Sequence, residues 1–167
     1  MEAITVRDLL TAVGGTLIGP ETSLDRTVSS VDTDSRDIHP GSLFLPLVGE
    51  RFDGHTYIGS ALEAGAAGCL TAREPEHYQE GRFYIKVEDT QRALRDLAFW
   101  YKEQFRIPFV GVTGSVGKTT AKDMIASVLS VKYKVLKTEG NFNNNVGLPL
   151  TLLRLDRSVQ IGVVEMG

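Results

Sequence analysis

Apolar and polar positions alternate along the chain in a way that predicts strands and helices in turn. Thr5 is expected to cap a first helix that ends at Gly14, and residues 56–64 form a second that Gly65 stops. Short apolar runs predict strands between the helices, at 28–32, 43–48, 67–71 and 83–87. This alternation is typical of layered α/β folds.

A longer helix is expected to follow Glu88-Asp89-Thr90 and to end near Phe105, and its apolar side chains recur at helical spacing. Three further strands are expected to form one parallel sheet, at 109–112, 133–138 and 159–165. The helix after residue 117 is expected to carry Met124, Ile125, Val128 and Leu129 on one side. We therefore predict two domains, residues 1–87 and 88–167.

Composition narrows the functional classes. The 167 residues carry a net charge of −3, which does not favour binding to nucleic acid. The apolar runs are too short for membrane insertion. Cys69 is the single cysteine and lies among apolar residues, so we expect a buried core thiol. The lack of disulfides and of a signal pattern predicts a cytoplasmic protein.

A glycine-rich loop, T-G-S-V-G-K-T-T at 113–120, stands between a predicted strand and a predicted helix. Gly114 and Gly117 let backbone N–H groups turn around an anion, and the helix N-terminus adds partial positive charge. Lys118 can reach the β- and γ-phosphates of a nucleotide, and the Thr119 hydroxyl can bind Mg²⁺. The strict pattern G-x-x-x-x-G-K-[ST] fails at Val112. We expect eight residues to contact the nucleotide: Thr113, Gly114, Ser115, Val116, Gly117, Lys118, Thr119 and Thr120.

Two further features lie downstream of this loop. Glu165 ends an apolar strand, where it is either a Mg²⁺ ligand or a glutamate that simply meets solvent. Four asparagines stand within residues 141–145, where they either form a turn or offer amides to a polar ligand. The residues alone leave the role of the asparagines open.

Three stretches together resemble the ATP-binding domain of the Mur ligases: G-V-T-G-S-V-G-K-T-T at 111–120, T-E-G-N-F-N-N-N-V-G-L-P-L-T-L-L at 138–153 and V-V-E-M-G at 163–167. The loop of this family has its glycine where Gly114 stands, which explains Val112. The earlier stretches 32–44, 49–58 and 61–68 resemble the uridine-nucleotide-binding domain of the same family.

The resemblance implies a small N-terminal α/β UDP-binding domain, followed by a truncated ATP-binding domain with a P-loop-type parallel sheet. It implies ATP and Mg²⁺ as cofactors, Lys118 and Asn145 as catalytic residues, and Thr119 and Glu165 as metal ligands. Arg36 has an alternative role in a surface salt bridge with Asp34 or Asp37. The substrate-binding residues implied are Ser35, Arg36, Glu50, Arg51, Asn141, Asn144 and Asn145.

Within the family, the asparagine segment resembles members that join D-alanyl-D-alanine to UDP-N-acetylmuramoyl-tripeptide through an acyl phosphate. These two compounds are thus the implied partners. Because such ligases have three domains, the chain is expected to be an inactive fragment of a monomeric parent, inclined to self-associate. The alternatives are a Mur-type ligase that adds another amino acid and a non-catalytic nucleotide- or UDP-sugar-binding module. A P-loop kinase or GTPase is disfavoured because no N-K-x-D motif is found.

Overall fold

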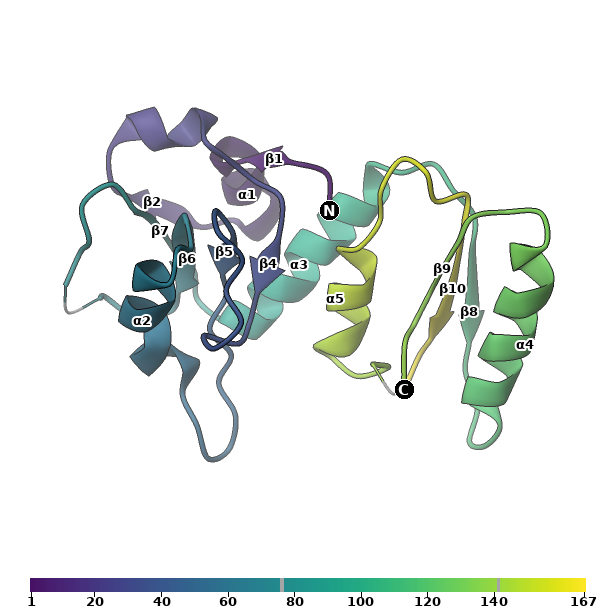
Figure 1. Cartoon of the computed structure of the whole chain (residues 1–167). Coiled ribbons are helices and arrows are strands. Elements are labelled where there is room, and N and C mark those ends of the chain that lie inside the picture. The colour runs from purple at the N-terminus through teal and green to yellow at the C-terminus, as the bar shows by residue number, and fades with distance from the viewer. Residues whose placement is uncertain (76, 141) are drawn as a thin grey trace. The chain divides into compact units, whose positions relative to one another are not determined.

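The computed structural model describes residues 1–75, 77–140 and 142–167. Its contacts divide the chain into two compact units: Ala3–Leu97, and Met1–Glu2 together with Ala98–Gly167. Helices and strands alternate through both units (Figure 1), so the predicted α/β fold class is confirmed. Across the described residues, no helix has both the length and the apolar character needed to span a membrane.

The first unit is built on a five-stranded sheet with the order β2-β7-β6-β5-β4. All neighbours are parallel except β2, which runs antiparallel to β7 and was not predicted because three residues are too few to show a period. The strands of this sheet are β2 (Thr16–Ile18), β4 (Val31–Asp32), β5 (Leu43–Phe44), β6 (Gly68–Thr71) and β7 (Phe83–Lys86).

Two predicted strands are shorter than the sequence indicates. The strand expected at 28–32 is interrupted, because β3 (Thr27–Val28) pairs antiparallel with β1 (Ile4–Thr5) whereas β4 pairs with β5 in the larger sheet. The strand expected at 43–48 ends after Phe44, two residues before Pro46, which has no N–H for a ladder.

Both predicted helices of this unit are present, although the second starts two residues later than the expected residue 56. Helix α1 (Val6–Val13) begins at a capping box between Thr5 and Asp8 and ends at Gly14 in the left-handed conformation, with φ of 61°. Helix α2 (Ile58–Glu63) is preceded by the 3₁₀ turn η2 (Gly54–Tyr57), and a second 3₁₀ turn, η1 (Glu21–Asp25), follows β2.

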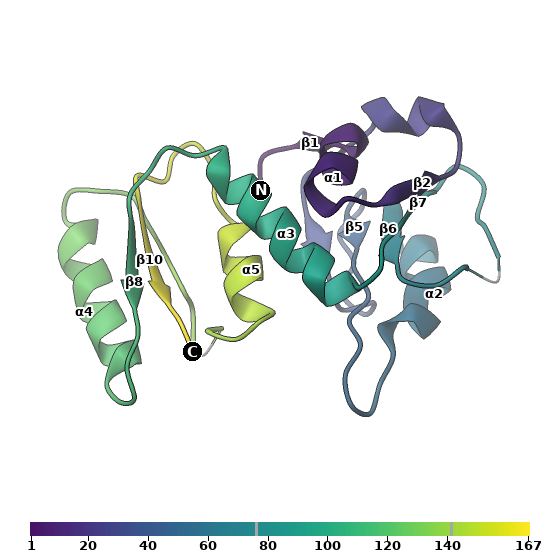
Figure 2. The same cartoon turned by 180° about the vertical axis from the view of Figure 1, so that it is seen from behind.

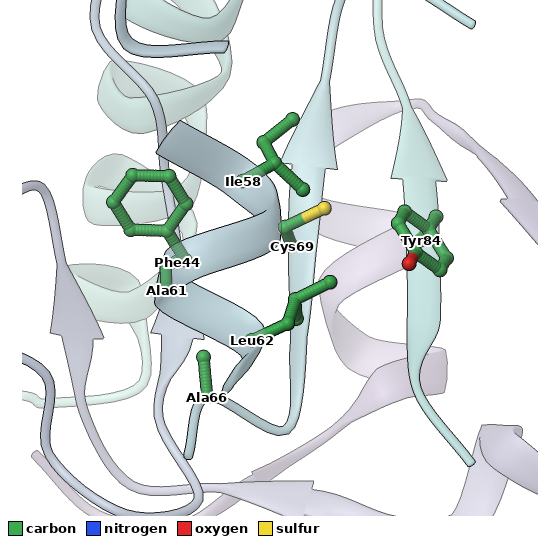
Figure 3. Packing of buried hydrophobic residues seen from close by; sticks show 7 residues of the cluster. All are labelled: Phe44, Ile58, Ala61, Leu62, Ala66, Cys69 and Tyr84. Atoms are coloured by element: carbon green, nitrogen blue, oxygen red, sulfur yellow. The ribbon is translucent and has the colours of Figure 1, made fainter. Parts of the chain in front are cut away.

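One core cluster of the first unit lies between α2 and the sheet. Figure 3 shows side chains of α2 and of strands β5, β6 and β7 gathered around Cys69. Burial raises the pKa of the Cys69 thiol to about 12, because the apolar surroundings disfavour the charged thiolate. The prediction of a core thiol is confirmed. The cluster consists of Phe44, Ile58, Ala61, Leu62, Ala66, Cys69 and Tyr84.

The second unit holds a three-stranded, fully parallel sheet with the order β8-β10-β9. Figures 1 and 2 both show this sheet between α4 (Lys118–Ser130) and α5 (Gly147–Leu152), a short helix that was not predicted. The register places Glu165 opposite Val112, so the carboxyl ends of β8 and β10 lie side by side. The strands are β8 (Phe109–Val112), β9 (Val135–Lys137) and β10 (Ile161–Glu165).

The buried Tyr101 hydroxyl joins three segments of the second unit. It accepts a hydrogen bond from the Glu2 backbone N–H at 2.7 Å and donates one to the Leu155 carbonyl oxygen at 2.7 Å. Tyr101 belongs to helix α3 (Thr90–Glu103), and the division between the two units falls inside this helix, after Leu97. The domain boundary after residue 87 stays a prediction.

We predict that Gly68→Ala lowers the free energy of unfolding by about 1–3 kcal/mol, because an added Cβ would lie 2.4 Å from the Phe83 carbonyl oxygen. The matched control is Gly59→Ala in α2, where nothing lies within 4 Å. It should be neutral or stabilise by about 0.5–1 kcal/mol, because alanine favours helix. Urea unfolding of both variants checks the pair, and equal effects would contradict the close packing of β6 on β7.

A second prediction concerns the domain boundary. A chain of residues 1–97 should unfold at a higher temperature than one of residues 1–87, because Ala93, Leu94 and Leu97 are buried and the contacts group them with the first unit. A loss of 1 kcal/mol corresponds to about 4–8 °C in a domain of this size. Thermal unfolding followed by circular dichroism measures the difference. Equal midpoints would support a boundary after residue 87.

Candidate nucleotide-phosphate site

The loop between β8 and α4 has a backbone that requires glycine at two points. Gly117 caps α4 with φ of 77°, and Gly114 has φ of 144°. Lys118 is the first residue of the helix, and its Nζ donates a hydrogen bond to the Gly114 carbonyl oxygen at 2.9 Å. The lysine side chain thus bridges the loop next to the helix N-terminus, where the first N–H groups of any α-helix have no partner within the helix.

A pocket of about 380 Å³ opens on this loop. Six of the eight predicted loop residues line it, and Glu165 of β10 lines it as well. Of the other two, Gly114 offers the carbonyl that holds Lys118, and Thr113 is exposed within the loop. Asn143, which the sequence did not single out, completes the lining. The lining residues are Ser115, Val116, Gly117, Lys118, Thr119, Thr120, Asn143 and Glu165.

Glu165 does not meet solvent, since only 2% of it is exposed. One carboxylate oxygen, Oε2, accepts a hydrogen bond from the Thr119 hydroxyl at 3.0 Å. The other, Oε1, accepts one from the Asn143 side-chain amide at 2.8 Å. The backbone N–H of Glu165 donates to the Thr138 hydroxyl at 3.0 Å. The carboxylate is therefore held on both oxygens by side chains from two other segments.

A lysine that the sequence analysis missed lies next to this carboxylate. Lys122 is buried, and its Nζ lies 3.9 Å from Glu165 Oε2 and 3.7 Å from Asp123 Oδ1. Lys137 of β9 donates to the same Asp123 oxygen at 2.8 Å. This hydrogen bond and the two ammonium charges hold the pKa of Asp123 below its usual value. Charges of alternating sign thus follow one another from β9 to the pocket, in the order Lys137, Asp123, Lys122 and Glu165.

The buried face of α4 is not its apolar side. Met124 and Val128 are exposed, at 65% and 73%, whereas the residues that the helix buries are Lys122 and Ala126. The helix is oriented by the pairing of Thr119 with Glu165, and Lys122 lies three residues further along the same face. The sequence contains a signal for the burial of Lys122. It stands three residues after Thr119, so both side chains lie on the same face of α4, and the Thr119 side of this helix faces the sheet.

The structure separates the roles of the asparagines. The Asn144 side-chain oxygen accepts from the backbone N–H groups of Val146 at 3.0 Å and Gly147 at 2.7 Å, which is the arrangement of a turn at the start of α5. Asn143 instead faces the pocket, and Asn145 is exposed between them and the helix. Asn141 lies outside the described residues. Substrate-binding roles for these asparagines stay predictions.

A second pocket, of about 470 Å³, lies within the first unit. Ser35 and Arg36 line it together with two exposed aromatic rings, those of Phe52 and Tyr57. Glu50 and Arg51 are exposed in the preceding loop and are not among its lining residues. The structure therefore brings together only the first pair of predicted UDP-binding residues.

Arg36 makes the salt bridge that the sequence left as an alternative. Its guanidinium contacts both carboxylate oxygens of Asp34, Nε to Oδ1 at 2.8 Å and Nη2 to Oδ2 at 2.6 Å. These hydrogen bonds lower the pKa of Asp34 to about 2. Since 87% of the Arg36 side chain is exposed, solvent screens the pair, and it adds little to stability. The guanidinium remains accessible at the edge of the second pocket.

The pocket at the glycine loop fits a divalent cation that arrives with phosphates. An octahedral Mg²⁺ with oxygen ligands at about 2.1 Å places neighbouring ligands roughly 3 Å apart. The Thr119 and Glu165 oxygens are 3.0 Å apart. Within the described part of the chain, no three histidine, cysteine, aspartate or glutamate side chains come together as a metal site. Phosphate oxygens and water would have to supply the remaining ligands.

A parallel strand, a glycine loop closed on a lysine, a helix N-terminus and an acidic residue on the neighbouring strand are characteristic of P-loop-type nucleotide-binding proteins. Residues 112–167 match the model of the Mur ligase middle domain, and residues 27–101 match that of the Mur ligase family, catalytic domain. The chain belongs to the Mur ligase family.

Curated relatives extend this result. The chain is 45% identical over 163 residues to UDP-N-acetylmuramoyl-tripeptide–D-alanyl-D-alanine ligase of Bacillus subtilis, covering 98% of the chain and 35% of that protein. It is 40% identical to the ligase of the same name from Escherichia coli, over all 167 residues and 35% of that protein. The chain therefore spans about a third of the length of these relatives.

Solved structures agree with the fold. The crystal structure of MurF from Acinetobacter baumannii matches the whole chain with a TM-score of 0.91 and 34% identity, over 36% of its own length. MurF ligase from Thermotoga maritima, solved in complex with ADP, matches 82% of the chain and 31% of its own, with a TM-score of 0.74 and 36% identity.

We predict that Asn144→Ala lowers the free energy of unfolding by about 1 kcal/mol, because the Val146 and Gly147 N–H groups lose their acceptor. The control Asn145→Ala changes an exposed neighbour and should stay within about 0.5 kcal/mol. Chemical denaturation of both variants measures the contrast. An unchanged free energy of unfolding for Asn144→Ala would mean that this side chain does not stabilise the turn.

Proposed function

We propose that this chain, as part of a protein of its relatives' length, serves an ATP-dependent ligase that joins D-alanyl-D-alanine to UDP-N-acetylmuramoyl-tripeptide. The observation that carries the proposal is the hydrogen-bonded pair of Thr119 and Glu165 beside the glycine loop, where Lys118 bonds to the Gly114 carbonyl. The relatives that are 40–45% identical to this chain are named for this activity. The activity requires a site for a nucleotide's phosphates, and the pocket has the residues of one.

Lys118 is the residue that we assign to the transferring phosphoryl group. In the structure its ammonium donates to the Gly114 carbonyl, a neutral acceptor that an anionic phosphate oxygen can replace. The first N–H groups of α4 would bind further phosphate oxygens. The assignment is supported by the Thermotoga maritima relative, whose crystals contain ADP.

Thr119 and Glu165 are the residues that we assign to Mg²⁺. When bound there, the cation would offset negative charge on the phosphates of ATP. Asn143 would hold the second carboxylate oxygen of Glu165 in place, since its amide donates to Oε1. Asn145 is the residue that we assign to the muramyl substrate near the phosphates, because it is exposed two positions from Asn143.

The first unit would hold the uridine diphosphate of the muramyl substrate. Arg36 offers an exposed guanidinium at the second pocket, and the Ser35 hydroxyl lies in the same lining. We assign Glu50 and Arg51 to the same ligand on the family resemblance, since they stand in the exposed loop next to this pocket. The cytoplasmic location stays a prediction.

In the proposed reaction, an oxygen of the tripeptide's terminal carboxylate attacks the γ-phosphorus of ATP, and ADP leaves. The amine of D-alanyl-D-alanine then attacks the acyl carbon, a C–N bond forms, the amine loses a proton, and inorganic phosphate leaves. Lys118 would stabilise the charge that develops on the phosphoryl oxygens in the first step.

A second candidate function applies to the 167 residues taken alone: a binding module without turnover. The observation that favours it is that both pockets are lined by groups for phosphates and a nucleotide, whereas we assign none of these residues to the adenine or to the acceptor amine. A Mur-type ligase for another amino acid is disfavoured by the name that the relatives share.

We predict that Lys118→Ala in the full-length ligase lowers the rate of phosphate release by about 10³-fold or more, because one positive charge at the transferring group is lost. The control Lys132→Ala removes a lysine from the turn that follows α4 and should leave the rate within about twofold. A coupled phosphate assay with UDP-N-acetylmuramoyl-tripeptide, D-alanyl-D-alanine and MgATP measures both. Near-normal turnover of the Lys118 variant would refute the site assignment, provided that thermal unfolding shows both variants folded.

A further inference from the structure

Lys122 is a buried cation with no role in the function proposed so far. Its side chain is among the largest that the structure fully buries, and only 1% of the residue is exposed. Burying an ammonium group is costly unless an opposite charge lies close to it. The two carboxylates within 4 Å are those of Glu165 and Asp123.

Asp123 is shared between two lysines, and the other one is closer. Lys137 Nζ lies 2.8 Å from Asp123 Oδ1, compared with 3.7 Å for Lys122 Nζ. Glu165, in contrast, has Lys122 as its cationic neighbour in the described structure, and both side chains are 2% exposed. The charge that balances Glu165 is therefore that of Lys122, before any ligand is present.

The charge balance decides what the pocket can bind. Lys118 and Lys122 carry two positive charges beside the single negative charge of Glu165. A lone divalent cation at Glu165 would be repelled by a buried ammonium about 4 Å from the same oxygen, where the effective dielectric constant is far below that of water. A polyphosphate brings the negative charges that remove this repulsion.

We propose that Lys122 is a positioning residue that neutralises Glu165, so that the pocket accepts a divalent cation only together with a polyphosphate. The inference rests on the proposed nucleotide-phosphate site. It adds that Thr119 and Glu165 bind a divalent cation only when a polyphosphate is bound as well. It makes the metal–nucleotide complex, rather than the free metal ion, the species that the site recognises.

The test is equilibrium dialysis of the 167-residue chain against Mn²⁺ alone and against Mn²⁺ with an equal concentration of tripolyphosphate, in the millimolar range. The variant is Lys122→Met, and the matched control is Lys132→Met, which removes the same charge from the turn after α4. For each protein, the measured quantity is the ratio of manganese affinity with tripolyphosphate to manganese affinity without it.

We expect the wild-type chain and the control to bind Mn²⁺ at least about tenfold more tightly with tripolyphosphate, and Lys122→Met to lose most of that ratio because it binds Mn²⁺ alone. A merely structural loss would weaken binding in both conditions and leave the ratio unchanged. Should the methionine variant fail to fold, Lys122→Gln, which removes the charge but keeps a polar side chain, carries the same expectation.

The outcomes separate the two proposals. A wild-type chain that binds Mn²⁺ with tripolyphosphate while Lys122→Met keeps the wild-type ratio overturns the role of Lys122 and leaves the phosphate site standing. A wild-type chain that binds Mn²⁺ equally well alone also overturns it, whatever the variants do. No manganese retained in either condition overturns the phosphate site itself, and the inference with it.

Discussion

The burial of one carboxylate, that of Glu165 at the end of β10, is the constraint on which the second unit depends. A buried carboxylate must be hydrogen-bonded and balanced by charge. Thr119, Lys122 and Asn143 meet this need from α4 and from the asparagine segment. The helix and the loop that carry these residues are thereby oriented on the sheet, and the pocket of the glycine loop opens beside the same carboxylate.

The parallel sheet explains why these groups come together. Because β10 lies between β8 and β9, its carboxyl end is adjacent to the strand that leads into the glycine loop and to Thr138, which follows β9. Ligands of parallel α/β sheets bind at this edge, where strands end and helices begin. In this chain the edge gathers a lysine, a hydroxyl, an amide and a carboxylate around one pocket.

The first unit is organised around an apolar core rather than around a buried carboxylate. Its sheet encloses an apolar core that includes Cys69, and its second pocket combines a guanidinium with two exposed aromatic rings. Arg36 is held by Asp34 but remains exposed, so the pair orients the guanidinium without burying it. The pocket at Arg36 therefore differs in character from the one at the glycine loop, which a lysine, a hydroxyl and a carboxylate line.

The fold class, the helix caps at Thr5 and Gly14, the glycine loop and the Mur ligase relationship can be predicted from the sequence, because these features depend on residues close together in the chain. Three further features emerge only in the folded chain. Lys122 lies within 4 Å of Glu165, Asn143 rather than Asn144 faces the pocket, and α4 exposes Met124 and Val128. These outcomes depend on which side chains of α4 and of the asparagine segment meet a carboxylate 22 or more residues away in the sequence. The spacing of apolar residues does not predict such a partner. It indicates which side of a helix is apolar, but not which distant lysine or amide will pair with a buried carboxylate.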